Sequence, residues 1–187
     1  NHAEVKGTVG EAPEHIYVDG TVEEVSDLKI PDERKVGYIT QTTLSLDDTA
    51  EIITALKERF PEIKGPAKDD ICYATQNRQN AVKALSKEVD LVLVVGAQNS
   101  SNSVRLLDVA ETTGVKARRI ESAAELDPEC LEEVRNVGIT AGATAPEDIV
   151  QGIVAEISKM SSSSSVRDLE IVQEDVTFAL PTVLRNA

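Results

Sequence analysis

Short apolar runs alternate along this chain with longer stretches in which apolar residues recur every three or four positions. The apolar runs have the length of buried strands, and the periodic stretches have the pattern of amphipathic helices. This pattern predicts strands over 36–40, 91–95, 116–120 and 137–140, and helices over 46–60, 78–89, 104–111, 128–134 and 147–158. Strands that alternate with helices pair in parallel through right-handed crossovers, so the pattern predicts an α/β fold.

Several residues mark the ends of these elements. Ser45 and Asp48 have the spacing of a capping box. Gly114 is typical of a helix terminus, and Pro146 suits the start of the last helix. A serine run over 161–165 indicates a flexible linker, and it leads to a tail rich in β-forming residues. No partner strand for this tail is evident nearby in the sequence.

The composition agrees with a sheet that is covered by helices. Of 187 residues, 41% are hydrophobic, whereas aromatic residues make up only 3% and tryptophan is absent. A core must therefore rest on Val, Ile, Leu and Ala, which is typical of parallel sheets buried on both faces.

The charge argues against two classes of partner. The formal net charge is -14, and broad contact with nucleic acid or an anionic membrane requires clustered Lys and Arg. No apolar run approaches the roughly 20 residues that span a bilayer. The N-terminal residues have neither the basic start nor the apolar segment of a secretion signal. A cytosolic location is the default expectation.

Three predicted strands are followed by loops of similar chemistry, QTTLS, GAQNSSNS and AGATAP. In an open parallel sheet, ligands bind beyond the carboxyl ends of the strands, where helix N-termini offer free amide groups. Ser100, Ser101 and Asn102 are neutral donors at such a place, with no acidic residue among them to repel an anion. The alternative is that Ser100 or Asn102 only caps the following helix, which is a common use of these residues.

Two other places carry candidate chemistry. His2 and Glu4 have the spacing that places both side chains on one face of a strand, as in many acid-base pairs. Cys72 and Cys130 are too few for a disulfide framework, and taken alone each is more typical of a small buried hydrophobic residue.

Five segments taken together resemble, in the same order, the 4-hydroxy-3-methylbut-2-enyl diphosphate reductase family. They are NHAEVKGTVG, TQTTLSLDDT, KDDICYATQNRQ, VVGAQNSSNS and TAGATAPEDIV, and the match extends to the tail EDVTFALPTVLR. The resemblance implies an iron-sulfur enzyme that ends the non-mevalonate isoprenoid pathway. Two electrons pass from a 4Fe-4S cluster to an allylic diphosphate, water leaves, and isopentenyl and dimethylallyl diphosphate result. It also implies an electron donor such as ferredoxin or flavodoxin, and a location in the cytoplasm or the plastid stroma.

The resemblance gives individual residues a role. Cys72 is similar to one of three cluster ligands, whereas Cys130 matches no motif of the family and is expected to be incidental. Glu4 is similar to the residue that delivers a proton to the leaving hydroxyl, and Thr42 to the residue that orders that hydroxyl or a water beside it. Thr144 stands where the family has a serine and keeps its hydroxyl. The residues similar to diphosphate ligands are His2, Ser100, Ser101, Asn102 and Thr144.

The resemblance also implies a division of the chain. Members of the family have three α/β domains in a trefoil arrangement around a central cavity, and the first domain carries the other two cluster cysteines and two more diphosphate-binding histidines. We expect two small parallel-sheet, three-layer domains here, a partial second domain over 1–70 and a third over 71–158. The segment 159–187 would be the linker and a tail that packs on the first domain. A non-redox phosphate-binding α/β module without a cluster remains the alternative.

Overall fold

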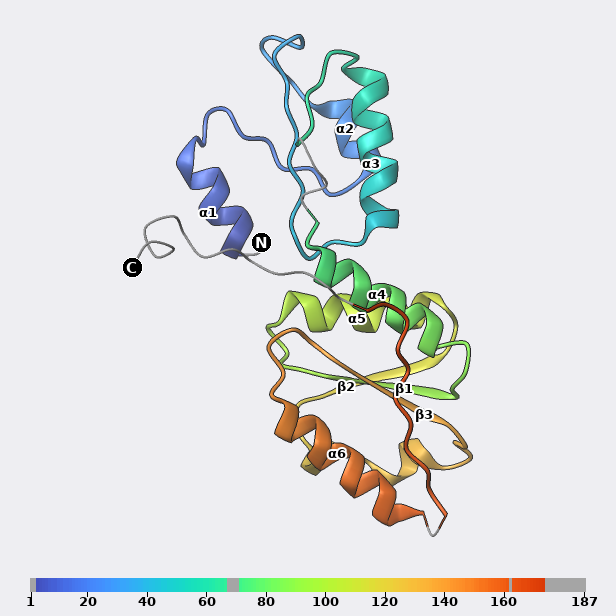
Figure 1. Ribbon diagram of the computed structural model, residues 1–187. Helices are drawn as coiled ribbons and strands as arrows, with labels where there is room; N and C mark the ends of the chain where they lie inside the picture. Colours follow the sequence, from blue (N-terminus) through green and yellow to red (C-terminus); the bar gives the residue numbers. More distant parts are fainter. Residues whose placement is uncertain (1–2, 67–70, 162, 174–187) are drawn as a thin grey trace, which may run out of the picture.

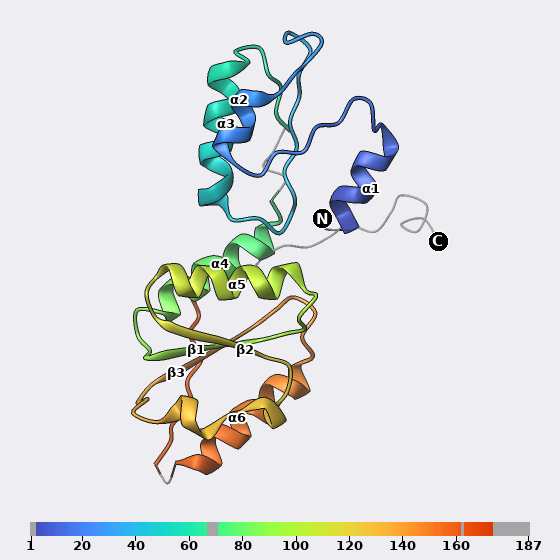
Figure 2. The same cartoon turned by 180° about the vertical axis from the view of Figure 1, so that it is seen from behind.

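The computed structural model describes residues 3–66, 71–161 and 163–173 (Figure 1). Three helices come first: α1 (Ala3–Glu11), α2 (Val22–Asp27) and α3 (Leu46–Arg59). The rest of the elements are α4 (Tyr73–Leu85), β1 (Leu91–Val95), α5 (Ser101–Thr112), β2 (Lys116–Ile120), the 3-10 helices η1 (Ala123–Glu125) and η2 (Pro128–Leu131), β3 (Val137–Ala141) and α6 (Glu147–Met160). Figures 1 and 2 show α1, α2 and α3 at one end of the molecule and the sheet with its helices at the other.

The sheet has three parallel strands in the order β2-β1-β3. Leu91 pairs with Lys116 on one side and with Val137 on the other, and the register continues to Val95. All five residues of β1 are buried, as expected for a central strand covered on both faces. The α/β class and the strands predicted at 91–95, 116–120 and 137–140 are therefore confirmed.

Helices cover both faces of the sheet, so this part of the chain has three layers (Figures 1 and 2). The side chains of β1 alternate between the two faces. Towards α4 and α5 the core contains Val82, Val92, Val94, Leu106, Val109 and Ala110. Towards α6 it contains Leu91, Leu93, Val95, Ile120, Leu126 and Ile153. This double burial fixes the plane of the strands and, with it, the position of the loops at their carboxyl ends.

The second sheet expected in the region 1–70 is not found among the described residues. The predicted strand over 36–40 is reduced to one parallel bridge between Gly37 and Lys64. The backbone N–H of Tyr38 donates to the Lys64 carbonyl at 2.9 Å, and that of Lys64 donates to the Val36 carbonyl at 3.0 Å. Two extended segments without a third strand are marginal, which explains why no ladder extends from this bridge.

The N-terminal residues also differ from the prediction. Glu4 was expected on a strand, but it lies in the first turn of α1, where an acidic side chain is favoured by the helix dipole. No residue of α1 is buried, so no packed partner imposes an extended conformation on this segment. His2 lies outside the described residues.

Several helix boundaries moved because polar side chains cap or pack where apolar periodicity gives no signal. Helix α4 begins at Tyr73 and ends at Leu85, not at 78 and 89, and α5 begins at Ser101, not at 104. Ser45 does cap α3, but its side chain accepts from the backbone N–H of Asp47 and not from residue 48. The acidic helix predicted over 128–134 is the short 3-10 turn η2, followed by Glu133 at a positive φ of 63°.

The serine-rich linker leads into an irregular segment. No strand forms among residues 163–173, and Arg167 there pairs with Glu88 in the turn before β1. Most of the β-rich tail, residues 174–187, lies outside the described residues, so its predicted packing stays a prediction. None of the helices in the described ranges combines the length and the apolarity that crossing a bilayer requires.

Candidate functional site

The loops after β1 and β3 meet at the carboxyl edge of the sheet. The backbone N–H of Gly142 donates to the Val95 carbonyl at 2.8 Å. Ser103, in the first turn of α5, is fully buried between Gly96 and Gly142. A Cβ added to Gly96 would lie 2.1 Å from the Ser103 Oγ, and one added to Gly142 would lie 2.2 Å from it. Both positions therefore require glycine for α5 to begin this close to two strand ends.

Ser100 caps α5. Its Oγ accepts from the backbone N–H of Ser103 at 3.3 Å, and the Ser103 Oγ lies 3.0 Å from the same oxygen. The first turn of α5 contains no acidic residue, so the positive end of the helix dipole is not neutralised by its own sequence. Ser100 is therefore the N-cap of α5.

Asn102 behaves differently. Its side chain is 7% exposed, and neither the Nδ2 nor the Oδ1 atom has a hydrogen-bond partner among the described residues. An unsatisfied buried polar group costs about 1 to 3 kcal/mol, so native structures rarely keep one without a reason. Because Asn102 does not cap the helix, capping does not account for it. An amide held in this state at a helix N-terminus fits a site for a polar ligand.

Two residues at the end of β2, Arg119 and Glu121, form hydrogen bonds that hold the loop after β1 in place. The Arg119 Nη1 donates to the Gly96 carbonyl at 2.8 Å and to the Glu121 Oε1 at 3.2 Å. The same Glu121 oxygen accepts from the backbone N–H of Gln98 at 2.9 Å. Neither residue could be identified from the sequence pattern, because the role of each depends on the register that places the end of β2 beside β1. Their position directly at the end of a predicted strand was the available signal.

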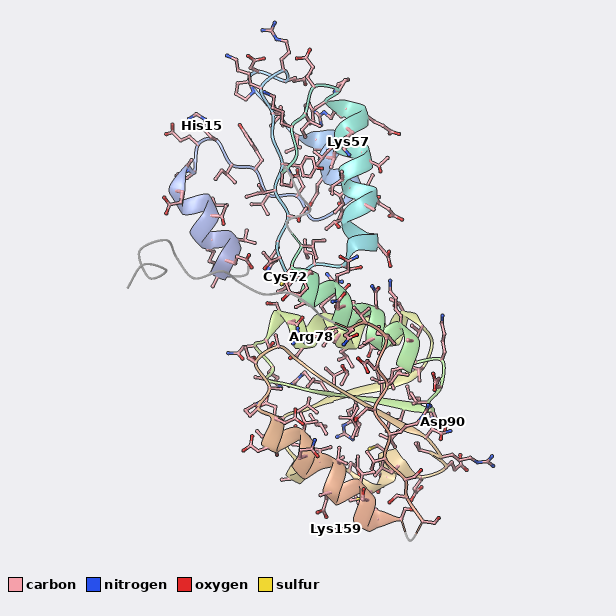
Figure 3. All side chains as sticks on the ribbon, viewed as in Figure 1. His15, Lys57, Cys72, Arg78, Asp90 and Lys159 are labelled. Atoms are coloured by element: carbon pink, nitrogen blue, oxygen red, sulfur yellow. The ribbon has the colours of Figure 1, made fainter. Side chains whose placement is uncertain are left out.

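Glu4, Thr42 and Cys72 come together from three separate segments. The Thr42 Oγ1 donates to the Glu4 Oε1 at 3.5 Å, and the backbone N–H of Cys72 donates to the Thr42 carbonyl at 3.3 Å. Cys72 is exposed and occupies the N-cap position of α4, where its side chain makes no capping hydrogen bond. Figure 3 shows Cys72 at the N-terminal end of α4, where the chain passes from the α1–α3 part to the sheet.

A cavity of about 310 Å³ connects the loop before α3 with the loop before α5. It is lined by Gln41, Thr43, Leu44, Gln98, Asn99, Ser101, Val104, Arg105 and Asp108. Ser101 is the one predicted ligand in this lining, and Gln41 and Thr43 flank Thr42 in the sequence. The side-chain amide of Gln79 on α4 fixes the loop before α3 by donating to the Leu44 carbonyl at 3.0 Å. The residues on either side of Thr42 and the first turn of α5 therefore border one cavity.

The remaining predicted residues contribute less to this arrangement. Thr144 is exposed in the loop between β3 and α6. Cys130 packs partly into the core beneath α6, whereas Cys72 begins α4 on the opposite face of the sheet. The two thiols therefore cannot serve one centre. The described residues contain no group of three or more His, Cys, Asp or Glu side chains that could hold a metal ion. Within them, the chain offers one open thiol to a cluster.

Comparison with known proteins identifies a family and a related fold. A model of the LytB protein family matches residues 1–158. The 4-hydroxy-3-methylbut-2-enyl diphosphate reductase of Azoarcus sp. (strain BH72) is 51% identical over 186 residues, covering 100% of this chain and 59% of that protein. The reductase of Nocardia farcinica (strain IFM 10152) is 49% identical over 186 residues, covering 99% of this chain and 55% of that protein.

A solved structure agrees over the same span. The E-1-hydroxy-2-methyl-but-2-enyl-4-diphosphate reductase from Plasmodium falciparum matches with a TM-score of 0.89 and 34% sequence identity, covering 100% of this chain and 59% of that one. The chain thus spans little more than half the length of these relatives. The family match, the sequence identity and the shared fold all cover the start of α5 and the segments that contain Glu4, Thr42 and Cys72. This chain therefore belongs to the LytB protein family.

Proposed function

We propose that this chain is part of a 4-hydroxy-3-methylbut-2-enyl diphosphate reductase and that the N-terminus of α5 binds the diphosphate of its substrate. The observation that carries the proposal is the buried amide of Asn102, which has no partner among the described residues. A phosphate oxygen accepts from an amide N–H, and a helix N-terminus favours negative charge. The names of the relatives supply the identity of the anion.

Neutral donors suit this site because the rest of the chain is acidic. With a formal net charge of -14, an anion is attracted only where local groups outweigh the general field. Ser100, Ser101 and Asn102 lie together at a helix terminus that meets two strand ends and has no acid in its first turn. Thr144 from the loop after β3 and His2 would complete the set of ligands.

The Glu4 and Thr42 pair is proposed to handle the proton. Replacing the allylic hydroxyl by hydrogen consumes two electrons and two protons and releases one water. Glu4 would give one proton to the leaving hydroxyl, because a C–O bond breaks more easily when the departing oxygen leaves as water. Thr42, whose hydroxyl donates to the Glu4 carboxylate, would orient that hydroxyl or a water beside it.

Cys72 is proposed as one thiolate ligand of a 4Fe-4S cluster. An exposed thiol that makes no capping hydrogen bond, held one backbone hydrogen bond away from Thr42, fits that role. When bound, such a cluster supplies the two electrons of the reduction. The other ligands would come from a part of the protein that these residues do not include, since Cys130 packs on the far face of the sheet.

We also propose a domain organisation, a redox partner and a location for the protein. Residues 1–70 and 71–158 would be the second and third domains of a three-domain trefoil, with 159–187 as linker and tail on the first domain. The expected partner is a small electron carrier such as ferredoxin or flavodoxin, and the expected location is the cytoplasm or the plastid stroma.

Binding of inorganic diphosphate tests the central assignment without depending on turnover. In the full-length protein, Asn102→Ala is expected to weaken binding by about 1 to 3 kcal/mol, the usual loss when a buried polar partner is removed. Asn80→Ala changes an exposed asparagine of α4 and should leave the affinity unchanged. Equal affinity of wild type and Asn102→Ala would remove the diphosphate from this terminus.

A further inference from the structure

We propose that Ser103 is a positioning residue that fixes the direction of the Ser100 hydroxyl, so that Ser100 can act only as a hydrogen-bond donor. This inference rests on the proposed binding of diphosphate at the N-terminus of α5. Ser103 itself is fully buried and is not proposed to touch the ligand.

Ser103 can fill the whole acceptor capacity of the Ser100 hydroxyl. A serine oxygen has two lone pairs and one O–H. The backbone N–H of Ser103 donates to the Ser100 Oγ at 3.3 Å, and the Ser103 Oγ lies 3.0 Å from it. If both groups of Ser103 donate, they occupy both lone pairs. The proton of Ser100 is then the only hydrogen-bonding function that the residue has left.

The two serine hydroxyls differ in burial, and this difference determines which of them donates to the other. The Ser103 Oγ is held between Gly96 and Gly142, and its partner among the described residues is the Ser100 Oγ. If Ser100 were the donor, the proton of Ser103 would be buried without an acceptor, at a cost of a lost hydrogen bond. Ser100 is half-buried and can direct its own proton outwards. The burial of Ser103 therefore decides the direction.

The consequence is selectivity for an acceptor. A ligand that presents only lone pairs, such as a phosphate oxygen, satisfies the Ser100 proton, whereas a ligand that presents an N–H or O–H finds no acceptor there. The two glycines take part in this arrangement, because any side chain at Gly96 or Gly142 would occupy the place of the Ser103 hydroxyl.

A double-mutant cycle on the full-length protein separates positioning from packing. Titration calorimetry with inorganic diphosphate compares wild type, Ser103→Ala, Ser100→Gly and the double variant. Glycine is chosen at Ser100 because it is nearly as good an N-cap as serine. Ser86→Ala, which removes a hydroxyl bond to the Val82 carbonyl on α4, is the matched control, and thermal melts of all variants measure folding.

We expect Ser103→Ala to weaken diphosphate binding about three- to tenfold, the effect of one hydrogen bond. Ser100→Gly should weaken it at least as much, and Ser103→Ala should add nothing in the Ser100→Gly background. An undiminished effect in that background, or an affinity loss matched by Ser86→Ala, would overturn the inference. If Ser103→Ala does not fold, wild-type affinity in Ser100→Gly overturns it alone. Unchanged affinity in Asn102→Ala would instead reject the diphosphate site itself.

Discussion

The buried amide of Asn102 leads to an unusual prediction, that its loss stabilises the ligand-free protein. Two unpaired polar atoms are shielded from solvent in the first turn of α5. Removing them recovers about 1 to 3 kcal/mol of desolvation. Truncation to alanine leaves a void of about one water molecule, roughly 30 Å³, which at roughly 24 cal/mol per Å³ costs about 0.7 kcal/mol. Asn102→Ala should therefore raise the free energy of unfolding by about 0.3 to 2.3 kcal/mol.

Urea denaturation of the full-length protein with and without inorganic diphosphate measures both halves of this prediction. Saturating ligand stabilises a protein in proportion to the logarithm of its concentration over Kd, so the wild type should gain more from diphosphate than Asn102→Ala. Asn80→Ala reports the helix-propensity gain that any exposed asparagine would give. The reasoning is refuted if ligand-free Asn102→Ala is less stable than wild type, or if diphosphate stabilises both proteins equally.

Three further predictions concern other parts of the chain. Gly142→Ala should lower the free energy of unfolding by about 1 to 3 kcal/mol, because the added methyl group overpacks against Ser103. Gly152→Ala in α6, which has open space around it, should raise the free energy of unfolding by about 0.5 to 1 kcal/mol. Equal melting temperatures of the two variants would contradict this prediction. Backbone N–H groups of residues 136 and 135 hold the pKa of Asp90 below its ordinary 3.8. The Asp90 carboxylate therefore contributes its full stabilisation above about pH 5. The difference in free energy of unfolding between wild type and Asp90→Asn should shrink as the pH falls below 3.8. A difference that stays constant down to acid unfolding would exclude this contribution. Glu4→Gln should retain diphosphate affinity and lose nearly all turnover in a steady-state assay, and activity within a few-fold of wild type would exclude Glu4 as the acid.

The parts of the fold that could be predicted are those that apolar residues specify. The run LVLVV is buried on both faces of the sheet, so each of its five residues is apolar and the sequence itself indicates a central strand. The start of α4 escaped prediction because Thr75, its buried residue before position 78, is polar. Gln79 is also polar and buried, and its amide donates to the distant Leu44 carbonyl. A periodicity of apolar residues cannot register such a contact.

The candidate site shows the same division. Ser100 and Asn102 were found because an acid-free run of donors between a strand and a helix is visible in the sequence. Which of them caps the helix depends on hydrogen-bond partners that only the folded chain supplies. Ser100 caps α5, whereas the buried amide of Asn102 has no partner among the described residues. The hydrogen bonds of Arg119 and Glu121 to the loop after β1 depend on strand register, so no local sequence motif predicts them. Glu4 was expected on a strand, but it lies in the first turn of α1. From this position its carboxylate still accepts a hydrogen bond from Thr42.

Iron and sulfide analysis of the anaerobically prepared full-length protein tests the central claim most directly. The wild type and Cys130→Ser, whose thiol is partly buried against the core beneath α6, should each contain about four iron and four sulfide per chain, with a brown chromophore. Cys72→Ser should lose most of both and all reductase activity towards the allylic diphosphate. A wild type without iron that still binds diphosphate, or a Cys72→Ser variant that keeps a stoichiometric cluster, would contradict the assignment and favour a phosphate-binding module without redox chemistry.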